Sequence, residues 1–193
     1  CEVISYESDG LPAEYLGNLL VPAWADHRVE RYELKPRGAS FGAERKPFIQ
    51  GGKDFYPSGL TVAPDGSLFV TDWGSKSYPL HGHGAIWHVR TKDAKPAARP
   101  KEPKDALLST DRKTREAAAR ELVKDEVGRK VLREQLGSKN VRVQAAALTA
   151  LVDAKDRDTP FEDIAWKSNE VGLRILAMTQ VYGHDKEFAD PKQ

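Results

Sequence analysis

The sequence predicts a two-domain α+β protein in which antiparallel β-structure precedes α-helices. Three observations predict it. Residues 1–90 hold 11 of the 15 glycines and 12 of the 16 aromatic residues. A segment with three prolines and eight charges follows, residues 91–105. The sequence beyond it is rich in Ala, Leu, Arg and Glu, which favour helices. A chain of 193 residues is long enough for one or two domains with their own cores.

Bulk composition excludes the function classes that depend on net charge. Lys and Arg number 30 and Asp and Glu 29, so the formal charge of +1 gives no basis for binding nucleic acid or an anionic membrane. No apolar run approaches the length of a membrane span. The single cysteine, Cys1, can form neither an internal disulfide nor a cysteine-rich metal site. Because the chain opens on "CEVISY" without a methionine, we expect a piece of a longer protein.

The first predicted element is a β-hairpin. Leu60 and Val62 alternate before Asp65-Gly66, and Leu68 to Val70 follow. Asp-Gly between two β-type runs is a strong hairpin signal because glycine tolerates the positive φ of a tight turn.

The hairpin sequence also repeats. "GNLLVPAWA" (Gly17 to Ala25) and "GSLFVTDWG" (Gly66 to Gly74) align without gaps, 49 residues apart. Further β-type runs follow each copy, at residues 28–34, 46–52 and 84–90. A β-repeat near 50 residues with three or four strands is typical of a propeller blade. We therefore expect about two antiparallel β-propeller blades in residues 1–90; the alternative is one small sheet with a chance repeat. Two blades cannot close a ring, so the other blades are expected upstream.

Residues 91–105 are expected to form an extended linker, because proline removes hydrogen-bond donors and charges resist burial. Beyond it, segments starting at Ser109, Ser138 and Ser168 align at spacings of 29 and 30 residues. They share columns of Ala, of Leu or Val, and of Arg or Gln; we interpret the Arg115 and Arg174 column as structural. Helix pairs at this spacing form an α-solenoid. We assign residues 106–184 to it and residues 185–193 to a polar tail.

Helix ends can be read from the sequence in two places. Thr159, Pro160 and Glu162 have the order of an N-cap, a first helical residue and a capping box. Gly137 follows an apolar periodic segment and predicts a helix C-cap.

The stretch "YPSGLTVAPDGSLFVTDWG…HGHGAIWHVR" resembles the last blade of glucose/sorbosone dehydrogenase-like propellers of large secreted bacterial proteins, notably of planctomycetes. "DGLPAEYLGNLLVPAW" resembles the preceding blade, and in such proteins HEAT-type repeats follow the propeller. The blade motif also fits NHL-type propellers, which mostly bind partners. The resemblance implies a periplasmic or secreted protein that oxidises sugars or polyols with pyrroloquinoline quinone and Ca²⁺ in the intact parent. Its catalytic base is expected in upstream blades, so we carry over no catalytic residue, and no Cys-x-x-Cys-His haem motif is present.

Asp72 is the first ligand-facing candidate. It ends the second strand of the hairpin, where propeller loops can face a channel, and a carboxylate there can orient a sugar hydroxyl or bind Ca²⁺. The alternative is that Asp72 caps a turn while Trp73 packs between blades. Trp24 aligns with Trp73, whereas Ala23 aligns with Asp72. Positions needed for blade structure should repeat from blade to blade, so the tryptophan fits a structural role, and Asp72 remains a candidate for a functional one.

Four further candidates lie in two loops. His81 and His83 flank Gly82 in the segment 75–85 and can approach one metal ion, although Zn²⁺ normally takes three or four ligands. Asp26 and His27 occupy the matching loop of the first unit. A solvated loop is the alternative for each of them. We therefore predict no metal site.

The sequence leaves three functions open. We interpret the chain as a catalytically inactive fragment of an extracytoplasmic sugar or polyol dehydrogenase-like parent. The alternatives are a propeller and helical scaffold that binds protein or glycan, and an adaptor, unrelated to quinoproteins, that binds a protein partner through its solenoid. We predict no dehydrogenase activity for the 193-residue chain in any of the three.

Overall fold

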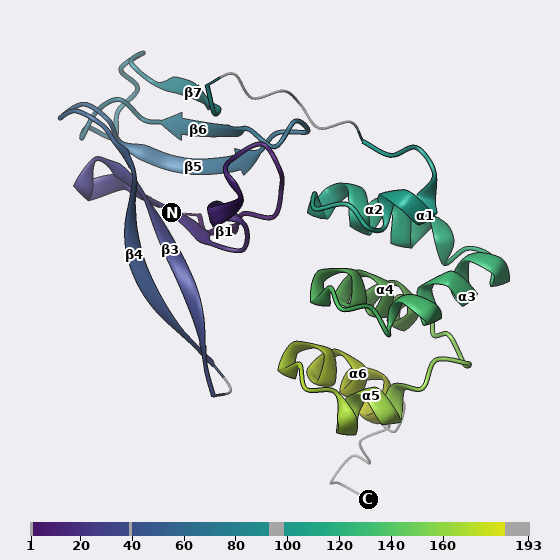
Figure 1. The fold of residues 1–193 in the computed structure, drawn as a ribbon. Helices are drawn as coiled ribbons and strands as arrows, with labels where there is room; N and C mark the ends of the chain where they lie inside the picture. The colour runs from purple at the N-terminus through teal and green to yellow at the C-terminus, as the bar shows by residue number, and fades with distance from the viewer. Residues whose placement is uncertain (1, 39, 93–98, 184–193) are drawn as a thin grey trace, which may run out of the picture. The chain divides into compact units, whose positions relative to one another are not determined.

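The computed structural model describes residues 2–38, 40–92 and 99–183 (Figure 1). The chain divides into two compact units, Cys1–Ala98 and Arg99–Gln193. The first unit holds two antiparallel sheets and the second holds helices, so the protein is α+β. These elements do not by themselves establish a propeller or a solenoid. Across the described part of the chain, no helix has the length and apolar character needed to cross a membrane.

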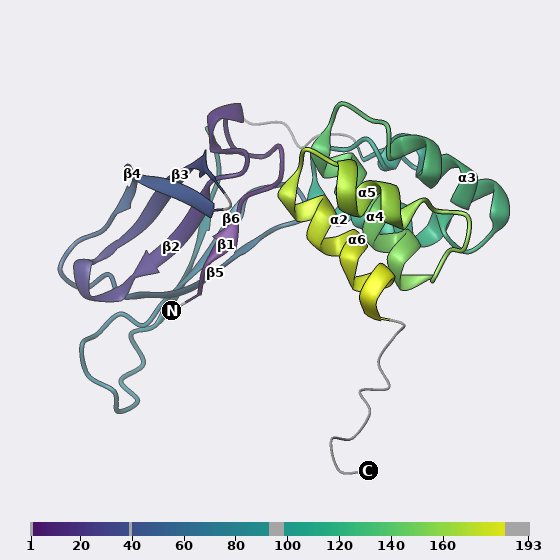
Figure 2. The same cartoon turned by 90° about the horizontal axis from the view of Figure 1, so that it is seen from below.

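The first sheet has four strands in the order β1-β2-β3-β4 (Figure 2). Their bounds are β1 Ile4–Ser5, β2 Leu19–Ala23, β3 Arg28–Arg37 and β4 Ser40–Gln50. Short 3₁₀ turns lie at Ala13–Tyr15 and Trp24–Asp26, and His27 ends the second one with a φ of 55°. A β-bulge between Val29 and Arg31 shifts the register of β3 against β4. β4 begins earlier than the predicted strand 46–52.

The second sheet contains β5 (Pro57–Val62), β6 (Leu68–Asp72) and β7 (Ala85–Val89) in sequence order. The predicted hairpin is confirmed, with Leu60 opposite Val70. The Ala63 N–H donates to the Ser67 carbonyl at 2.8 Å, which closes the turn. Gly66 has a φ of 81°, and a Cβ there would lie 2.3 Å from the Gly10 nitrogen, so only glycine fits.

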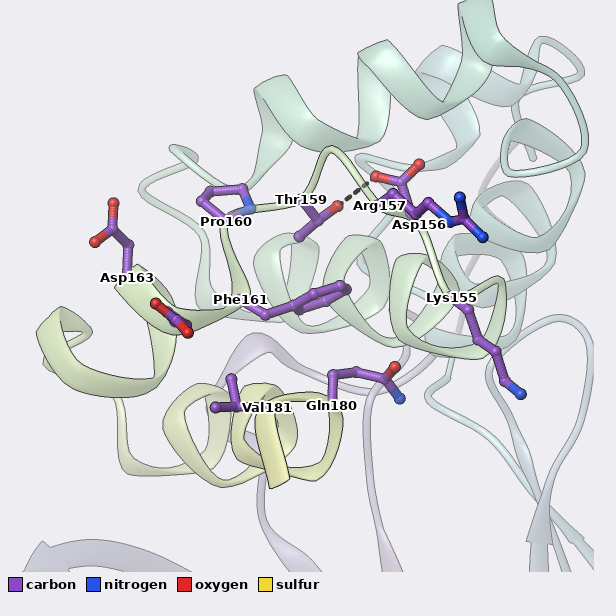
Figure 3. Close-up of a pocket in the computed structure, with 10 residues that line it drawn as sticks. Lys155, Asp156, Arg157, Thr159, Pro160, Phe161, Asp163, Gln180 and Val181 are labelled. Carbon is purple, nitrogen blue, oxygen red and sulfur yellow. Dashed lines mark hydrogen bonds between the residues drawn. The ribbon is translucent and has the colours of Figure 1, made fainter. Parts of the chain in front are cut away.

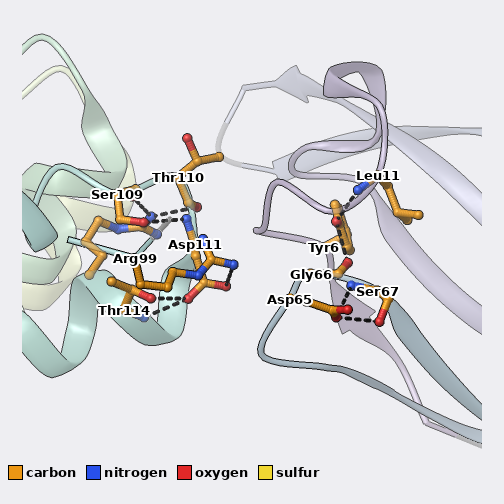
Figure 4. A network of polar contacts seen from close by, with 11 residues as sticks. Tyr6, Leu11, Asp65, Gly66, Ser67, Arg99, Ser109, Thr110, Asp111 and Thr114 are labelled. Atoms are coloured by element: carbon orange, nitrogen blue, oxygen red, sulfur yellow. Dashed lines mark hydrogen bonds and ion pairs between the residues drawn. The ribbon is translucent and has the colours of Figure 1, made fainter. Parts of the chain in front are cut away.

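The two sheets bury one shared core. It contains side chains from both sheets and from the segments between them: Tyr6, Leu11, Leu20, Val29, Phe55, Leu60, Leu68 and Val70. The Tyr6 hydroxyl crosses this core, donating to the Gly66 carbonyl at 2.8 Å and accepting from the Leu11 N–H at 2.7 Å (Figure 4). Burial raises the pKa of Tyr6, so the hydroxyl stays protonated and can serve as a donor. The bond ties the start of the chain to the β5–β6 turn.

The second unit contains six helices in the described residues. They are α1 Pro103–Ala106, α2 Arg112–Leu122, α3 Glu126–Gln135, α4 Val141–Asp153, α5 Phe161–Lys167 and α6 Val171–Gly183. α4 is the central helix: it shares one core with α1, α2 and α3, and a second core with α5 and α6. Its residues Ala147, Leu148 and Leu151 are completely buried.

The three aligned starts of the helical repeat are built alike. The serine hydroxyl at Ser109, Ser138 and Ser168 accepts in each case from the N–H two residues on, at 3.1 to 3.2 Å. The Arg or Gln column behaves alike too. Arg115 donates to the Ser109 carbonyl, Gln144 to the Leu136 carbonyl and Arg174 to the Ala165 carbonyl, so each bonds a carbonyl in or shortly after the preceding helix.

Three sequence-based details need correction. Thr159 does not cap α5: its hydroxyl donates to Asp156, and the N-cap is Pro160 with no side-chain bond. Gly137 is not a left-handed C-cap, because its φ is not positive. The predicted linker 91–105 overlaps α1, since Ala106 and Leu107 pack into the helical core and order the segment before them. Residues 93–98 and the polar tail lie outside the described residues.

Candidate functional site

The carboxylate of Asp72 is buried, 7 % exposed, and receives three N–H donors. Its Oδ1 accepts from the backbone N–H of Tyr56 at 2.7 Å and of Gly74 at 2.9 Å. Its Oδ2 accepts from the indole Nε1 of Trp87 at 2.9 Å. Together these bonds join the entry to β5, the end of β6 and the edge strand β7. Both oxygens are therefore engaged in holding the second sheet.

Asp26 and His27 lie in the turn between β2 and β3. The imidazole of His27 makes a hydrogen bond to the Phe55 carbonyl at 2.9 Å through Nδ1, and its ring lies 4.7 Å from that of Tyr56. Asp26 is exposed and pairs with Arg28 at 3.1 Å. Tyr56 touches both candidates, since its ring packs against His27 and its backbone N–H donates to Asp72. Within the described part of the chain, His27 and Asp72 make no hydrogen bond to each other.

Trp24 extends this aromatic cluster. Its ring lies 4.8 Å from that of Tyr56 and 6.3 Å from that of Tyr78, which is 83 % exposed. The tryptophan of the β2–β3 turn thus packs against residues that flank the second sheet, a contact between the sheets that fits an architectural role.

His81 and His83 lie side by side in the loop before β7. Their rings stack at 5.4 Å, and the His83 N–H donates to Nδ1 of His81 at 3.0 Å. Trp73 meets His81 edge-on at 5.2 Å. An Nδ1 that accepts a hydrogen bond has no free lone pair for a metal. Among residues 2–38, 40–92 and 99–183, these histidines do not join Asp72 in any group of three ligands within 4.8 Å.

Glu30 is a charged centre that the sequence analysis did not single out. It lies in β3 where the register against β4 shifts, and its carboxylate accepts from Tyr32 at 2.5 Å, Arg28 at 2.8 Å and Arg45 at 3.1 Å. The Tyr32 hydrogen bond, reinforced by the two arginines and opposed by burial, lowers the pKa of Glu30 from 4.5 to about 2. The same bond raises the pKa of Tyr32. The spacing of Arg28, Glu30 and Tyr32, two residues apart on one strand, was a readable signal.

A second missed cluster lies in the helical unit. Glu126, Asp156 and Asp158 are the one set of three potential metal ligands that lie close together in the described residues. The guanidinium of Arg133 occupies their centre, bonding both oxygens of Asp156 at 2.9 Å and also pairing with Glu126 and Asp158. Burial opposes ionisation of Asp156, yet the bonds from Thr159 and Arg133 hold its pKa below its ordinary value. The Arg133 guanidinium thus already supplies the positive charge that these three carboxylates would otherwise take from a metal ion.

Next to this cluster is a surface hollow of about 580 Å³ (Figure 3). Lys155 and Arg157 line it together with Asp163, Phe161 and Val181, so it mixes both signs of charge with apolar side chains. The hydroxyl of Thr159 donates to Asp156 at its wall, at 2.6 Å. Mixed charge favours no single class of ligand.

Comparison with known proteins gives one match. A family model described as a domain of unknown function (DUF7133) matches residues 1–77, which includes the first sheet and the β5–β6 hairpin. No curated protein and no solved structure matches. The first part of the chain is therefore similar to a family whose function is itself not known.

Proposed function

We propose that this chain is a structural scaffold: two consecutive blades of a β-propeller followed by helix pairs stacked in the manner of HEAT repeats. The scaffold belongs to an extracytoplasmic protein and serves protein or glycan binding. The main support for the proposal comes from two aligned strands, β2 and β6, which bury different faces.

These strands bury opposite faces. Leu20 of β2 is 0 % exposed, whereas Phe69, the β6 residue aligned with it, is 39 % exposed. The neighbouring position reverses: Leu68 is 0 % exposed, and Leu19, aligned with it, is only partly buried. Because side chains alternate between the faces of a strand, the shared core takes one face of the first sheet and the opposite face of the second.

Opposite faces are the expected result for units that follow one another around a ring. Such units all point the same way, so neighbours contact through opposite faces. Two sheets related by a twofold axis would instead contact through the same face. The other face of the β5-β6-β7 sheet is then the place where a next blade would pack. On that face Phe69, Ile86 and His88 are exposed.

The aligned glycines give further support, since Gly17 and Gly66 both have a φ of 81°. In the helical unit, the three serine hydroxyls that accept from the N–H two residues on support a true repeat of 29 to 30 residues. Repeats that bury a common core in this way form solenoids.

In this proposal, any catalysis takes place in parts of the parent protein outside this chain. The oxygens of Asp72 are engaged by N–H donors, and His81 uses Nδ1 internally, so these residues do not fit a site for Ca²⁺ or a quinone. Sugar or polyol oxidation with pyrroloquinoline quinone and Ca²⁺ in the parent rests on the family resemblance, as does its periplasmic or secreted location. We derive no step of that reaction from this chain.

Two experiments test the proposal. The isolated chain, supplied with pyrroloquinoline quinone, Ca²⁺, an artificial electron acceptor and a panel of aldoses and polyols, is expected to show no turnover; measurable turnover would contradict a scaffold. For the ring order, Phe69→Asp is compared in the isolated chain and in the intact parent. We expect the variant to be harmless in the first and to lower the melting temperature in the second. Equal tolerance in both would remove the blade assignment.

A further inference from the structure

Strand β7 is an edge strand with the composition of a strand that has neighbours on both sides. Within the described residues it pairs with β6 alone (Figure 1). Its five residues, Ala85–Val89, include no Lys, Arg, Asp, Glu or Pro. Ile86 is nevertheless 72 % exposed and Trp87 50 % exposed. Because an edge strand presents unpaired N–H and C=O groups, an apolar edge without charges favours pairing with a further strand.

The edge strand of the first sheet, β4, has the features that prevent such pairing. It contains Arg45, Lys46 and Pro47 in a row. Charged side chains resist being covered, and proline lacks the N–H that a further strand would need. The register shift of the β3–β4 pair lies at the same place. β4 is thus suited to be the last strand of its sheet, whereas β7 is not.

The repeat shows which strand β7 lacks. The alignment of the two units places β2 on β6. In the first sheet Val21 lies opposite Glu30, and in the second sheet the aligned Val70 lies opposite Trp87. β7 therefore has the position of β3. The position that β4 takes beside β3 is not filled beside β7 by any strand of the described residues.

A hollow of about 270 Å³ lies where the side chains of such a strand would point. Trp87 and Val89 line it from β7, while Ile49 and Phe55 line it from the first sheet and the segment after it. The hydrogen bond from its indole to Asp72 holds Trp87 in place. A strand paired with β7 would turn every second side chain to the face of Trp87 and Val89. The volume is below the roughly 300–1,000 Å³ of small-molecule pockets, which favours the insertion of side chains.

The chemistry of the hollow specifies the side chains that fit it. In the first sheet the equivalent positions are Glu30 and Tyr32, and Arg45 of β4 lies opposite Tyr32 and bonds Glu30 at 3.1 Å. The described residues that line the hollow of the second sheet carry no charge. A charged side chain would lose its hydration there without gaining a partner. Leu, Ile or Phe is therefore the expected residue at this position.

We propose that β7 is a strand-addition site. An extended segment of a partner protein pairs with Ala85–Val89 as the fourth strand of the second sheet, and two of its apolar side chains, two residues apart, enter the hollow beside Trp87 and Val89. The inference rests on the protein-binding role proposed above and gives that role a site. It does not rest on the ring order, so the comparison of Phe69→Asp variants can fail while the strand still binds.

The test is a titration of the isotopically labelled chain with a synthetic peptide, followed by NMR. The probe is the blocked peptide Lys-Thr-Leu-Thr-Leu-Thr-Lys, in which threonines favour an extended strand and the two leucines share one face. We expect saturable shift changes at the β7 amides and at the Trp87 indole. The β7 N–H groups that do not bond β6 should exchange more slowly with solvent.

Two controls define the specificity of the binding. A peptide with Asp in place of both leucines is expected to bind at least about tenfold more weakly, because a carboxylate loses its hydration in an apolar hollow. β4 is the control within the same molecule, since it is an edge strand with Lys46 and Pro47, and its amides should not respond.

Saturable binding of the leucine peptide at β7, with weaker binding of the aspartate peptide, supports the proposal. It is overturned by no binding of the leucine peptide up to its solubility limit, by equal binding of the two peptides, or by a response centred on β4. Protection of every β7 N–H without peptide also overturns it, because the edge is then already paired in the free chain. The dehydrogenase assay measures turnover, so its outcome and that of the titration are read separately.

Discussion

The indole of Trp87 donates to the carboxylate of Asp72, Nε1 to Oδ2 at 2.9 Å, across the β6–β7 pair. The other oxygen of the same carboxylate accepts the backbone N–H groups of Tyr56 and Gly74. Asp72, which the sequence analysis singles out as a candidate ligand contact, therefore joins three segments of one sheet through hydrogen bonds. A charged acceptor in this position makes stronger hydrogen bonds than a neutral one.

Replacing Asp72 by Asn tests whether the hydrogen bonds to its carboxylate stabilise the second sheet. The amide keeps the shape but loses the charge, and its NH₂ group faces an N–H donor, so we expect a loss of about 1–3 kcal/mol in the free energy of unfolding of the first unit. Urea denaturation followed by tryptophan fluorescence measures it. Asp26→Asn, at an exposed carboxylate, is the control and should change little. A stable Asp72→Asn chain would contradict the structural role and return Asp72 to the list of ligand contacts.

Leu20 and Phe69 form a matched pair, because they align in the repeat yet differ in exposure. Leu20→Asp buries an unpaired carboxylate in the shared core and should cost more than about 4 kcal/mol, enough to unfold the sheets. Phe69→Asp loses only a stacking contact with His88 at 4.6 Å and should cost no more than about 1 kcal/mol in the isolated chain. Thermal melts monitored by circular dichroism compare them. Equal effects would mean that the buried faces are assigned wrongly.

The lowered pKa of Glu30 predicts that the folded protein loses stability at acid pH. Its folded pKa of about 2 lies below the ordinary value of 4.5, so the folded state binds this proton less readily than the unfolded state. The stabilisation is therefore complete above 4.5 and is lost as the pH falls towards 2. We expect Glu30→Gln to be less stable than the wild type at neutral pH and to show a shallower loss of melting temperature across that window.

Glu44 supplies the control for this titration. Its pKa is also lowered to about 2, by Lys46 and Lys35, but the pair lies in solvent. Water screens such pairs, so Glu44→Gln should change the pH profile much less. Matching profiles for the two variants would contradict a special role for Glu30.

Arg133 should be essential to the acidic cluster of the helical unit. Asp156 is 3 % exposed at its side chain, so Arg133→Ala leaves a buried carboxylate without its cation and should cost about 3–5 kcal/mol. Glu126→Gln, at an exposed partner, should cost less than about 1 kcal/mol. Chemical denaturation of the second unit gives both values. If Arg133→Ala retained full stability, Asp156 would need another partner.

The elements that the sequence predicted well are those whose signal is local. The β5–β6 hairpin follows from alternation around Asp65-Gly66, and the helices α2, α4 and α6 follow from aligned apolar columns. β1 could not be predicted, since two residues carry no periodicity. The first half of β4 extends beyond the core and is exposed on both faces, so it shows no alternation. α1 lay hidden in a proline-rich segment because its order comes from packing on α2.

The candidate site shows the same difference between features with a local sequence signal and features set by contacts between distant residues. Alternation along β6 places Asp72 on the same face as Leu68 and Val70, but two of its three donors, Tyr56 and Trp87, lie 16 and 15 residues away. No sequence pattern reports that convergence. Glu30 was missed although its spacing from Arg28 and Tyr32 puts all three on one face of β3, because the third partner, Arg45, comes from the neighbouring strand. The spacing of His81 and His83 allows both imidazoles to approach one point, but the bond between the two residues is a detail of loop geometry that the sequence does not report.

The serine contacts of the helical unit have a consequence for how such a chain can change in length. Each serine hydroxyl and the N–H that it binds lie two residues apart, so every start is complete within its own segment. A gene duplication or deletion of 29 or 30 codons therefore carries its own serine contact with it and breaks no serine contact in the neighbouring segments. The helical unit can therefore grow or shrink by whole segments without separating any serine from the turn that it closes.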